Sequence, residues 1–310
     1  MNRDSVNWRG AMPAVITPFD ERGEIDRDAF CENVERQFDA GASGILVGGC
    51  TGEFWSLSFD ERVTLFKLGR EATGTRGVVL AGTGAITVDE TLRLSDAAGE
   101  AGVDGALILP PYFIRLSDDE VFEHYRSVDR GISLPIVLYN IPGNALNALS
   151  PALAGRLADL DSVVAIKESS GDWNNFHATL IRVKDQIRVF CGPASIFGME
   201  ALHAGADGII DCFPNVWLPG AYDLLRAVEG GHLEEARSLQ ATGRRLTELF
   251  TSNGRSLYPS TKAAMGILGY RAGRPRPPLQ PLHDEQLDEL RCGLRSLGVS
   301  RLSQAPSRVR

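Results

Sequence analysis

One lysine of this chain lies in an unusual place. Lys167 directly follows the apolar run "VVAI" from Val163, and the chain has only four lysines against 28 arginines. Burial at the end of such a strand would favour the neutral amine, because loss of water penalises the charged form. A neutral amine can attack a carbonyl carbon and form a Schiff base. The alternatives are a lysine that extends into solvent, or one that pairs with its neighbour Glu168.

A tyrosine lies in a similar setting. Tyr139 closes the apolar run "IVLYN" from Ile136. Beside a Schiff-base lysine, a phenol can carry protons to and from a substrate. The alternative is an aromatic ring that only fills the end of the fold.

The stretch "LVGGCTGEFW", Leu46 to Trp55, has the glycine content of an anion-binding loop. Glycines allow sharp turns and leave backbone N–H groups bare. Four interpretations are open: a phosphate site, a carboxylate site to which Thr51 adds its hydroxyl, a nucleophilic Cys50, and a tight turn without a ligand. Cys50 has no histidine or other cationic partner nearby in the sequence that would activate the thiol.

A repeated sequence pattern indicates the secondary-structure elements that must position these residues. Ala-Gly, two residues, Gly and an apolar run recur in "AGASGILVGG" from Ala40, "AGVDGALILP" from Ala101 and "AGADGIIDCF" from Ala204. The first glycine suits a left-handed helix end and the apolar run suits a buried strand. The phrase therefore predicts repeated helix-to-strand junctions.

Further apolar runs predict eight strands, centred near residues 15, 46, 79, 107, 137, 165, 189 and 209. Amphipathic stretches between them predict helices, for example over 60–73, 87–101 and 117–130. Continuous apolar strands are typical of a parallel sheet buried on both faces. The fold class is therefore predicted as α/β, a (β/α)8 TIM barrel with a C-terminal helical segment; a doubly wound sheet is the alternative.

In such a barrel the carboxyl ends of the strands form the catalytic face, and Lys167, Tyr139 and the glycine loop all fall there. The loop follows the second strand, whereas phosphate sites usually follow the seventh and eighth. A Walker A sequence is absent. The position therefore favours a carboxylate as the ligand of the loop.

The chain divides into three parts by its pattern. Residues 1–217 are expected to carry the barrel strands and most helices, and residues 218–299 the last barrel helix and a C-terminal helical segment. The proline-rich stretch "RAGRPRPPLQP" predicts an extended connection before a last helix over 284–297. Residues 300–310 form a polar tail.

Composition excludes several classes of protein. A net charge of −8 argues against a nucleic-acid surface, and no apolar run reaches the roughly 20 residues of a membrane helix. The five cysteines and five histidines show no metal-ligand spacing, so neither a metal nor another cofactor is predicted. The first ten residues lack the apolar core of a secretion signal, and we expect a cytoplasmic protein.

The motifs "GGCTGE", "AGTGA", "ILPPYF", "VLYNIP" and "AIKESSGD", in this order, resemble those of the dihydrodipicolinate synthase / N-acetylneuraminate lyase family. The resemblance covers about residues 8–268. It implies a TIM barrel that acts on 2-oxo acids through a lysine Schiff base, often as a tetramer. It also implies the site residues: Lys167 as the Schiff-base lysine, Tyr139 for proton transfer, Gly49, Cys50 and Thr51 at the substrate carboxylate, and Gly192 and Ile210 lining the pyruvyl pocket.

The chain departs from the synthases of that family at three positions. Cys50 replaces a Ser or Thr, Phe113 replaces a tyrosine donated across the subunit interface, and Asn144 replaces a carboxylate-binding arginine. These changes argue against dihydrodipicolinate synthase activity. Asn144, Ser169 and Asp211 are instead expected to face the distal part of the substrate, where amide, hydroxyl and carboxylate groups suit a hydroxylated chain.

The sequence therefore predicts a lyase for a 2-oxo acid, with aldol cleavage or condensation of a 2-keto-3-deoxy sugar acid, or a similar hydroxylated acid, as the reaction and pyruvate as one product. A dehydratase or deaminase using the same lysine imine is the close alternative. A non-catalytic relative that binds 2-oxo acids and a phosphate- or flavin-binding barrel are more remote. The expected partners are the small 2-oxo acid and further copies of the chain, as a dimer or tetramer.

Overall fold

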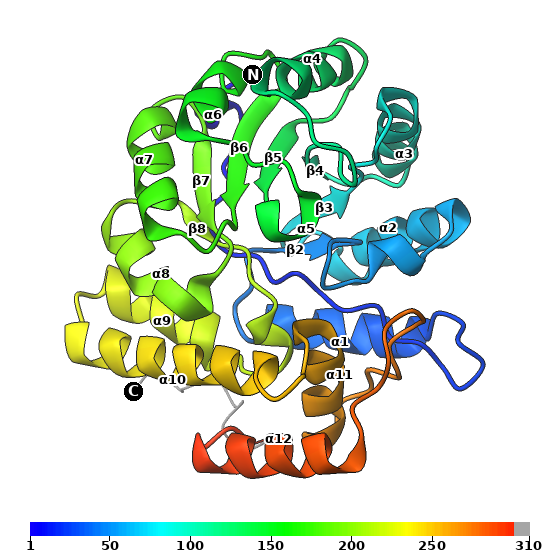
Figure 1. Ribbon diagram of the computed structural model, residues 1–310, viewed down its shortest axis with the longest axis vertical. Helices are drawn as coiled ribbons and strands as arrows, with labels where there is room; N and C mark the ends of the chain where they lie inside the picture. Colours follow the sequence, from blue (N-terminus) through cyan, green and yellow to red (C-terminus); the bar gives the residue numbers. More distant parts are fainter. Residues whose placement is uncertain (301–310) are drawn as a thin grey trace.

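The computed structural model describes residues 1–300, and these form a (β/α)8 TIM barrel followed by additional helices (Figure 1). Eight parallel strands run around the barrel in the order β1-β8-β7-β6-β5-β4-β3-β2. Their bounds are β1 Gly10–Ala11, β2 Gly44–Val47, β3 Val78–Gly82, β4 Gly105–Ile108, β5 Ile136–Asn140, β6 Val163–Glu168, β7 Arg188–Cys191 and β8 Gly208–Ile209. The predicted polar tail over 300–310 lies, apart from Ser300, outside the described residues.

The first strand differs in position from its prediction near residue 15. Its ladder with β8 covers only Gly10 and Ala11, although the N–H groups of Met12 and Ala14 still donate to the Ile209 and Asp211 carbonyls, both at 2.9 Å. The barrel is nevertheless closed: Ala14 bridges to Leu46 of β2, and the N–H of Val15 donates to the Leu46 carbonyl at 3.0 Å.

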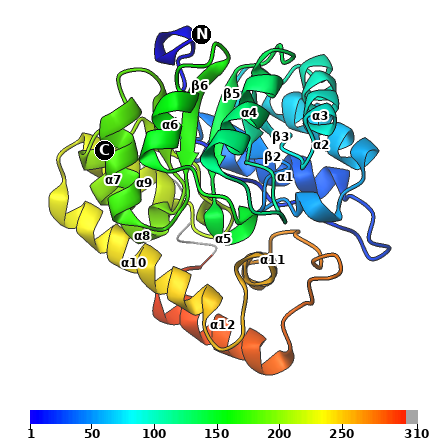
Figure 2. The same ribbon diagram turned by 45° about the horizontal axis from the view of Figure 1, so that its top comes forward.

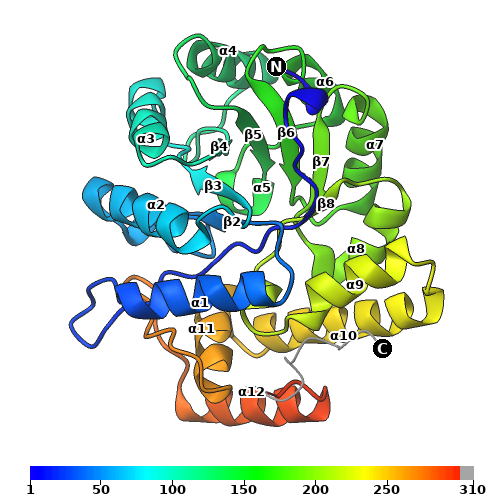
Figure 3. The same cartoon turned by 180° about the vertical axis from the view of Figure 1, so that it is seen from behind.

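Helices surround the barrel and extend beyond it (Figures 1 and 3). Those within the barrel are α1 Arg27–Asp39, α2 Phe59–Thr73, α3 Val88–Glu100, α4 Asp118–Asp129, α5 Pro142–Ala145, α6 Pro151–Leu157, α7 Trp173–Val183, α8 Ala194–His203 and α9 Pro219–Glu229. The later ones are α10 Leu233–Thr251, α11 Leu257–Ile267 and α12 Asp284–Ser296. Within residues 1–300, none combines the length and apolar character needed to cross a bilayer.

The repeated Ala-Gly phrase is the predicted helix-to-strand junction. In all three copies the first glycine has a positive φ, for example 110° at Gly41 and 103° at Gly205. The last glycine begins a strand where there is no space for a side chain: a Cβ on Gly208 would lie 2.0 Å from the carbonyl oxygen of Gly10. The two glycines therefore meet two steric requirements: the first allows a left-handed helix end, and the last allows two strands to approach closely.

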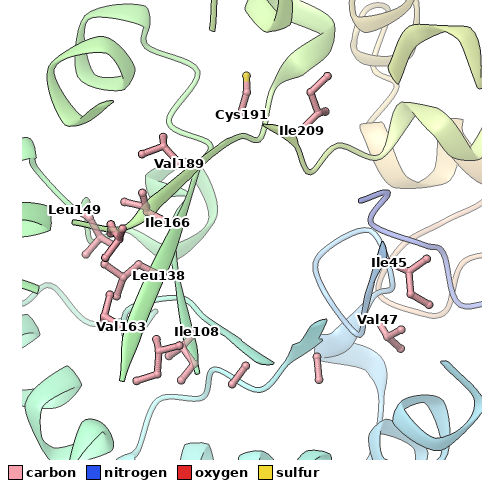
Figure 4. Close-up of a cluster of buried hydrophobic side chains, with 14 of the residues drawn as sticks. Ile45, Val47, Ile108, Leu138, Leu149, Val163, Ile166, Val189, Cys191 and Ile209 are labelled. Atoms are coloured by element: carbon pink, nitrogen blue, oxygen red, sulfur yellow. The ribbon is translucent and has the colours of Figure 1, made fainter. Parts of the chain in front are cut away.

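Apolar side chains of the strands divide between two cores. Figure 4 shows Ile45, Ile108, Ile166 and Val189 pointing away from the barrel axis, toward the surrounding helices. The barrel interior is filled by a second set that includes Trp8, Leu80, Leu107 and Phe190. Since both faces of each strand are buried, the strands read as continuous apolar runs.

The C-terminal helices lie together on one side of the barrel (Figures 1 and 2). They form a third core with η3, Phe213–Asn215, around residues such as Phe250, Met265 and Leu290. The segment between α11 and α12 has no regular secondary structure, as its prolines predict. This packing brings α10 and α11 to the end of the barrel where the site residues lie.

Candidate active site

Lys167 and Tyr139 are neighbours on adjacent strands. They are paired in register across β6 and β5, and both are buried, with 6% and 4% of their surface exposed. The Lys167 Nζ atom lies 4.4 Å from the centroid of the Tyr139 ring. The two groups that the sequence singled out separately are thus in contact.

Burial lowers the pKa of Lys167, while Cys50 and Asp211 oppose that shift because their ionised forms stabilise the ammonium ion. Lys167 forms no ion pair within residues 1–300, and Glu168 does not serve as its partner. The Glu168 carboxylate instead accepts hydrogen bonds from Asn140 at 2.8 Å and Asn175 at 3.1 Å. The arrangement therefore favours a neutral, nucleophilic amine.

The loop after β2 turns sharply at Gly48, which has a φ of 64°. A side chain on the adjacent strand end would block this turn, since a Cβ on Gly82 would lie 2.2 Å from the Gly48 carbonyl oxygen. Within the described chain, the N–H groups of Cys50 and Thr51 and the Thr51 hydroxyl have no hydrogen-bond partner. Three donors are therefore free for an anion.

The Cys50 thiol is buried beside Tyr139, whose hydroxyl donates to Cys50 Sγ over 3.8 Å. Burial is the largest cause of a raised pKa at Cys50, although Lys167 opposes it. Burial likewise raises the pKa of Tyr139 well above its usual value. A thiol held in its protonated form is a poor nucleophile, so the geometry disfavours that reading of Cys50.

Most of the residues predicted for the site line one cavity of about 170 Å³ at the barrel mouth. They are Cys50, Thr51, Tyr139, Lys167, Ser169, Gly192, Ile210 and Asp211. Gly49 and Asn144 do not line it. Gly49 lies behind the loop against Leu46, and Asn144 is an exposed residue of α5.

Two polar side chains of this cavity, Ser169 and Asp211, differ in the number of hydrogen bonds that they already form within the protein. The Ser169 hydroxyl is buried without a hydrogen-bond partner, and it fits only because residue 192 is glycine: a Cβ there would lie 1.7 Å from Ser169 Oγ. The Asp211 carboxylate accepts from the N–H groups of Ser195 at 3.0 Å and Cys212 at 2.6 Å. Ser169 is thus the group with a bond left to offer a ligand.

The C-terminal helices also line the cavity, which the sequence reading missed. Thr247 and Thr251 come from α10, and Leu257 and Tyr258 from the start of α11. These residues follow no strand, and a helical pattern alone gave no signal that they approach the barrel mouth.

A buried ion pair fastens α11 to the glycine loop. Lys262 Nζ lies 2.5 Å from Glu53 Oε1, and the two side chains are 1% and 0% exposed. The other Glu53 oxygen accepts from the backbone N–H of Arg276 at 2.9 Å, and Lys262 donates to the Arg274 carbonyl at 3.2 Å. Burial lowers the pKa of Lys262 to about 8. Glu53 itself adopts a left-handed conformation, φ 56° and ψ 40°.

Comparison with known proteins gives consistent results. The model of the Dihydrodipicolinate synthetase family matches residues 7–296. The 4-hydroxy-tetrahydrodipicolinate synthase of Heliobacterium modesticaldum is 32% identical over 92% of this chain and 94% of its own. Among solved structures, a putative dihydrodipicolinate synthetase from Pseudomonas aeruginosa is 30% identical, with a TM-score of 0.87 over 94% of this chain and 100% of its own. YagE, a prophage protein from E. coli K12 solved in complex with pyruvate, is 26% identical, with a TM-score of 0.89 over 95% of this chain and 100% of its own.

Proposed function

The chain belongs to the dihydrodipicolinate synthetase family, and on that premise we propose that it is a lyase that binds a 2-oxo acid as a Schiff base on Lys167. The observation that carries the proposal is the contact between a buried lysine of lowered pKa and the ring of Tyr139, at the wall of a polar cavity. The pyruvate bound by the relative YagE is a 2-oxo acid of the kind proposed.

In the proposed reaction the neutral amine of Lys167 adds to the C2 carbonyl, and the carbonyl oxygen leaves as water. The free N–H groups of the loop and the Thr51 hydroxyl hold the substrate carboxylate, which fixes C2 close to the amine. The iminium ion withdraws electrons from C3. The C3–C4 bond then breaks: the Tyr139 oxygen takes the C4 hydroxyl proton as the phenol passes its own proton on, C4 leaves as an aldehyde, and the bond electrons form an enamine of pyruvate.

We propose a hydroxylated chain, such as a 2-keto-3-deoxy sugar acid, as the distal part of the substrate. Apart from Lys167, no cationic side chain of residues 1–300 lines the cavity, so a second carboxylate would lack a partner. The unpartnered Ser169 hydroxyl and the nearby Asp211 suit substrate hydroxyls. The uncharged Asn144 does not line the cavity itself but donates to the hydroxyl of Tyr258, which does.

The 4-hydroxy-tetrahydrodipicolinate synthase reaction is the second candidate, because curated relatives such as that of Heliobacterium modesticaldum carry this name. Against it stand Cys50, Phe113 and Asn144, at the positions where the synthases have a hydroxyl, a tyrosine and an arginine. The relatives share only about one-third of their residues with this chain, so we base the proposal on these three residues and not on the name of a relative.

A product assay tests the proposed function. The enzyme is incubated with a panel of 2-keto-3-deoxy sugar acids, and separately with pyruvate and aldehydes that include aspartate semialdehyde. Pyruvate and an aldehyde as products indicate an aldolase, whereas a retained carbon skeleton indicates a dehydratase or deaminase. Turnover of aspartate semialdehyde alone would assign the synthase reaction instead. A trapped pyruvate adduct without any turnover would indicate a binding protein.

Replacing Cys50 with serine is expected to leave adduct formation with pyruvate within about twofold of wild type, because the thiol is not the nucleophile. Borohydride reduction followed by intact mass analysis measures the adduct. If the serine variant forms none, Cys50 takes part in imine formation and its assignment here is wrong.

We also propose that the chain forms a homo-oligomer. Phe113, Ile114 and Leu146 are exposed apolar side chains, and Asn147 ties their loops together by donating to the Pro111 and Ile114 carbonyls at 2.6 and 2.8 Å. Light scattering is expected to give the mass of a dimer or larger assembly, and Phe113→Asp is expected to lower it. A monomer at micromolar concentration would contradict the proposal.

The free thiols Cys50, Cys191 and Cys212 fit the reducing cytoplasm that we propose as the location of the protein.

A further inference from the structure

The Cys50 thiol lies between two phenols. On one side the Tyr139 hydroxyl donates to Cys50 Sγ over 3.8 Å. On the other side lies Tyr258, whose hydroxyl opposes the rise that burial causes in the pKa of Cys50 and which lines the same cavity. All three side chains line the same cavity, so a chain of exchangeable protons runs away from the reacting centre.

Tyr258 is held in a defined orientation by residues of two other segments. It is the second residue of α11, and its ring lies 5.2 Å from that of Trp55 between centroids. Asn144 Nδ2 donates to the Tyr258 hydroxyl oxygen at 3.0 Å. The phenol oxygen has a second lone pair, so it can also accept from the thiol while its own hydrogen is directed to water.

The side chains become more exposed from Tyr139 and Cys50 to Tyr258 and Asn144. Tyr139 and Cys50 are buried, Tyr258 is half-buried, and its partner Asn144 is exposed. Tyr258 therefore stands where a proton can pass between the closed cavity and solvent. Phe113 has no hydroxyl and cannot take this place, whichever subunit presents it.

We propose that Tyr258 completes a proton relay within one chain, from Tyr139 through Cys50 to Tyr258 and on to solvent. The inference rests on the proposed function, because it assigns a route for the proton that Tyr139 handles. The helical segment after the barrel thereby contributes to the chemistry and not only to packing.

The protons balance in both directions. During cleavage the Tyr139 oxygen takes the C4 hydroxyl proton while its own proton passes to Cys50 Sγ; the thiol proton passes to the Tyr258 oxygen, and the Tyr258 proton to water. The electrons of the C3–C4 bond form the enamine double bond. On return, one proton travels inward by the same steps to C3 of the enamine, which restores the imine for hydrolysis.

The return path can be followed with pyruvate alone, by NMR of deuterium uptake at C3 in D2O, while borohydride trapping reports the imine separately. Tyr258→Phe is expected to lower the rate constant of exchange by about 100-fold, the lower end of general acid–base effects. The yield of adduct and the KM for pyruvate are expected to stay within about twofold of wild type. Loss of packing alone would raise KM or lower the adduct yield.

Four further variants test the order of the groups in the relay. Cys50→Ala is expected to match the loss in Tyr258→Phe, and the double variant to lose no more than either single variant, because the groups act in series. Cys50→Ser keeps an exchangeable proton and is expected to retain exchange. Tyr112→Phe removes another phenol near the barrel mouth, one that does not line the cavity, and is expected to exchange like wild type.

The outcomes separate the two proposals. A normal adduct with unchanged exchange in Tyr258→Phe would overturn the relay while leaving the Schiff-base function intact. Additive losses in the double variant would overturn it too, since they show independent roles. No adduct in the wild-type protein would overturn the proposed function, and the relay with it.

Discussion

Replacing Lys167 with methionine is expected to abolish the pyruvate adduct and to lower turnover by about 10,000-fold or more, as removal of a covalent nucleophile does. Methionine approximates the volume of lysine and removes only the amine, so the barrel should remain folded. Thermal unfolding is expected at or above the wild-type temperature, because a desolvated amine is replaced by an apolar side chain. The measurements are borohydride trapping with peptide mass analysis, turnover and a thermal melt.

Lys167→Arg is the matched variant that keeps a positive charge. Its guanidinium stays protonated, so it too should form no adduct, which separates nucleophilicity from charge. Lys67→Met, at an exposed position of α2, controls for the loss of a lysine elsewhere. An adduct that persists in Lys167→Met, or one that maps to Lys262, would refute the assignment.

The rate of trapping should also depend on pH in a specific direction. Imine formation requires the neutral amine, and burial lowers the pKa of Lys167 from its ordinary value near 10.4. The rate in the wild-type protein is therefore expected to rise with pH and to level off below the pH at which an exposed lysine would. An inflection at the ordinary value would mean that Lys167 is solvated.

Replacing Lys262 with methionine is expected to lower the free energy of unfolding by about 3–5 kcal/mol, because it leaves the Glu53 carboxylate buried without its cation. Urea denaturation followed by circular dichroism measures this. Lys67→Met should change the same quantity by about 0.5 kcal/mol or less, as exposed substitutions do. Glu53→Gln combined with Lys262→Met should recover part of the loss, since no charge remains unpaired.

The pH dependence of stability gives an independent check on Lys262. Its pKa is about 8 in the folded chain and near 10.4 in the unfolded chain, so between these values the unfolded state binds more protons. The contribution of this group to the free energy of unfolding therefore rises as pH increases from about 8 to about 10. That rise should be absent in Lys262→Met. Equal slopes in the two proteins would show that Lys262 titrates normally when folded.

The strand ends were readable from the sequence because their chemistry stands out locally. Lys167 and Tyr139 each close an apolar run, and parallel strands bring their carboxyl ends to one edge of a barrel. The register that pairs Tyr139 with Lys167 follows from that rule. The glycines of the repeated phrase were equally readable, since each meets a steric need within a few residues of itself.

Lys262 and Tyr258 could not be read in the same way. Both lie in an ordinary helix, with no apolar strand before them and no motif around them. Lys262 depends on Glu53, and Tyr258 on Cys50, both about 200 residues away. Neither contact exists until the helices after the barrel pack against its mouth.

The sequence by itself predicted the barrel, and it singled out the lysine, the tyrosine and the glycine loop as candidates, because periodicity and local sterics are properties of short segments. The tertiary structure alone decided which side chains surround the lysine and how they are bonded. It placed Tyr258 beside Cys50, left the Ser169 hydroxyl without a partner, and buried Lys262 against Glu53. Burial and hydrogen bonding depend on packing between distant segments, and these two properties set the pKa values and the proton path that we propose.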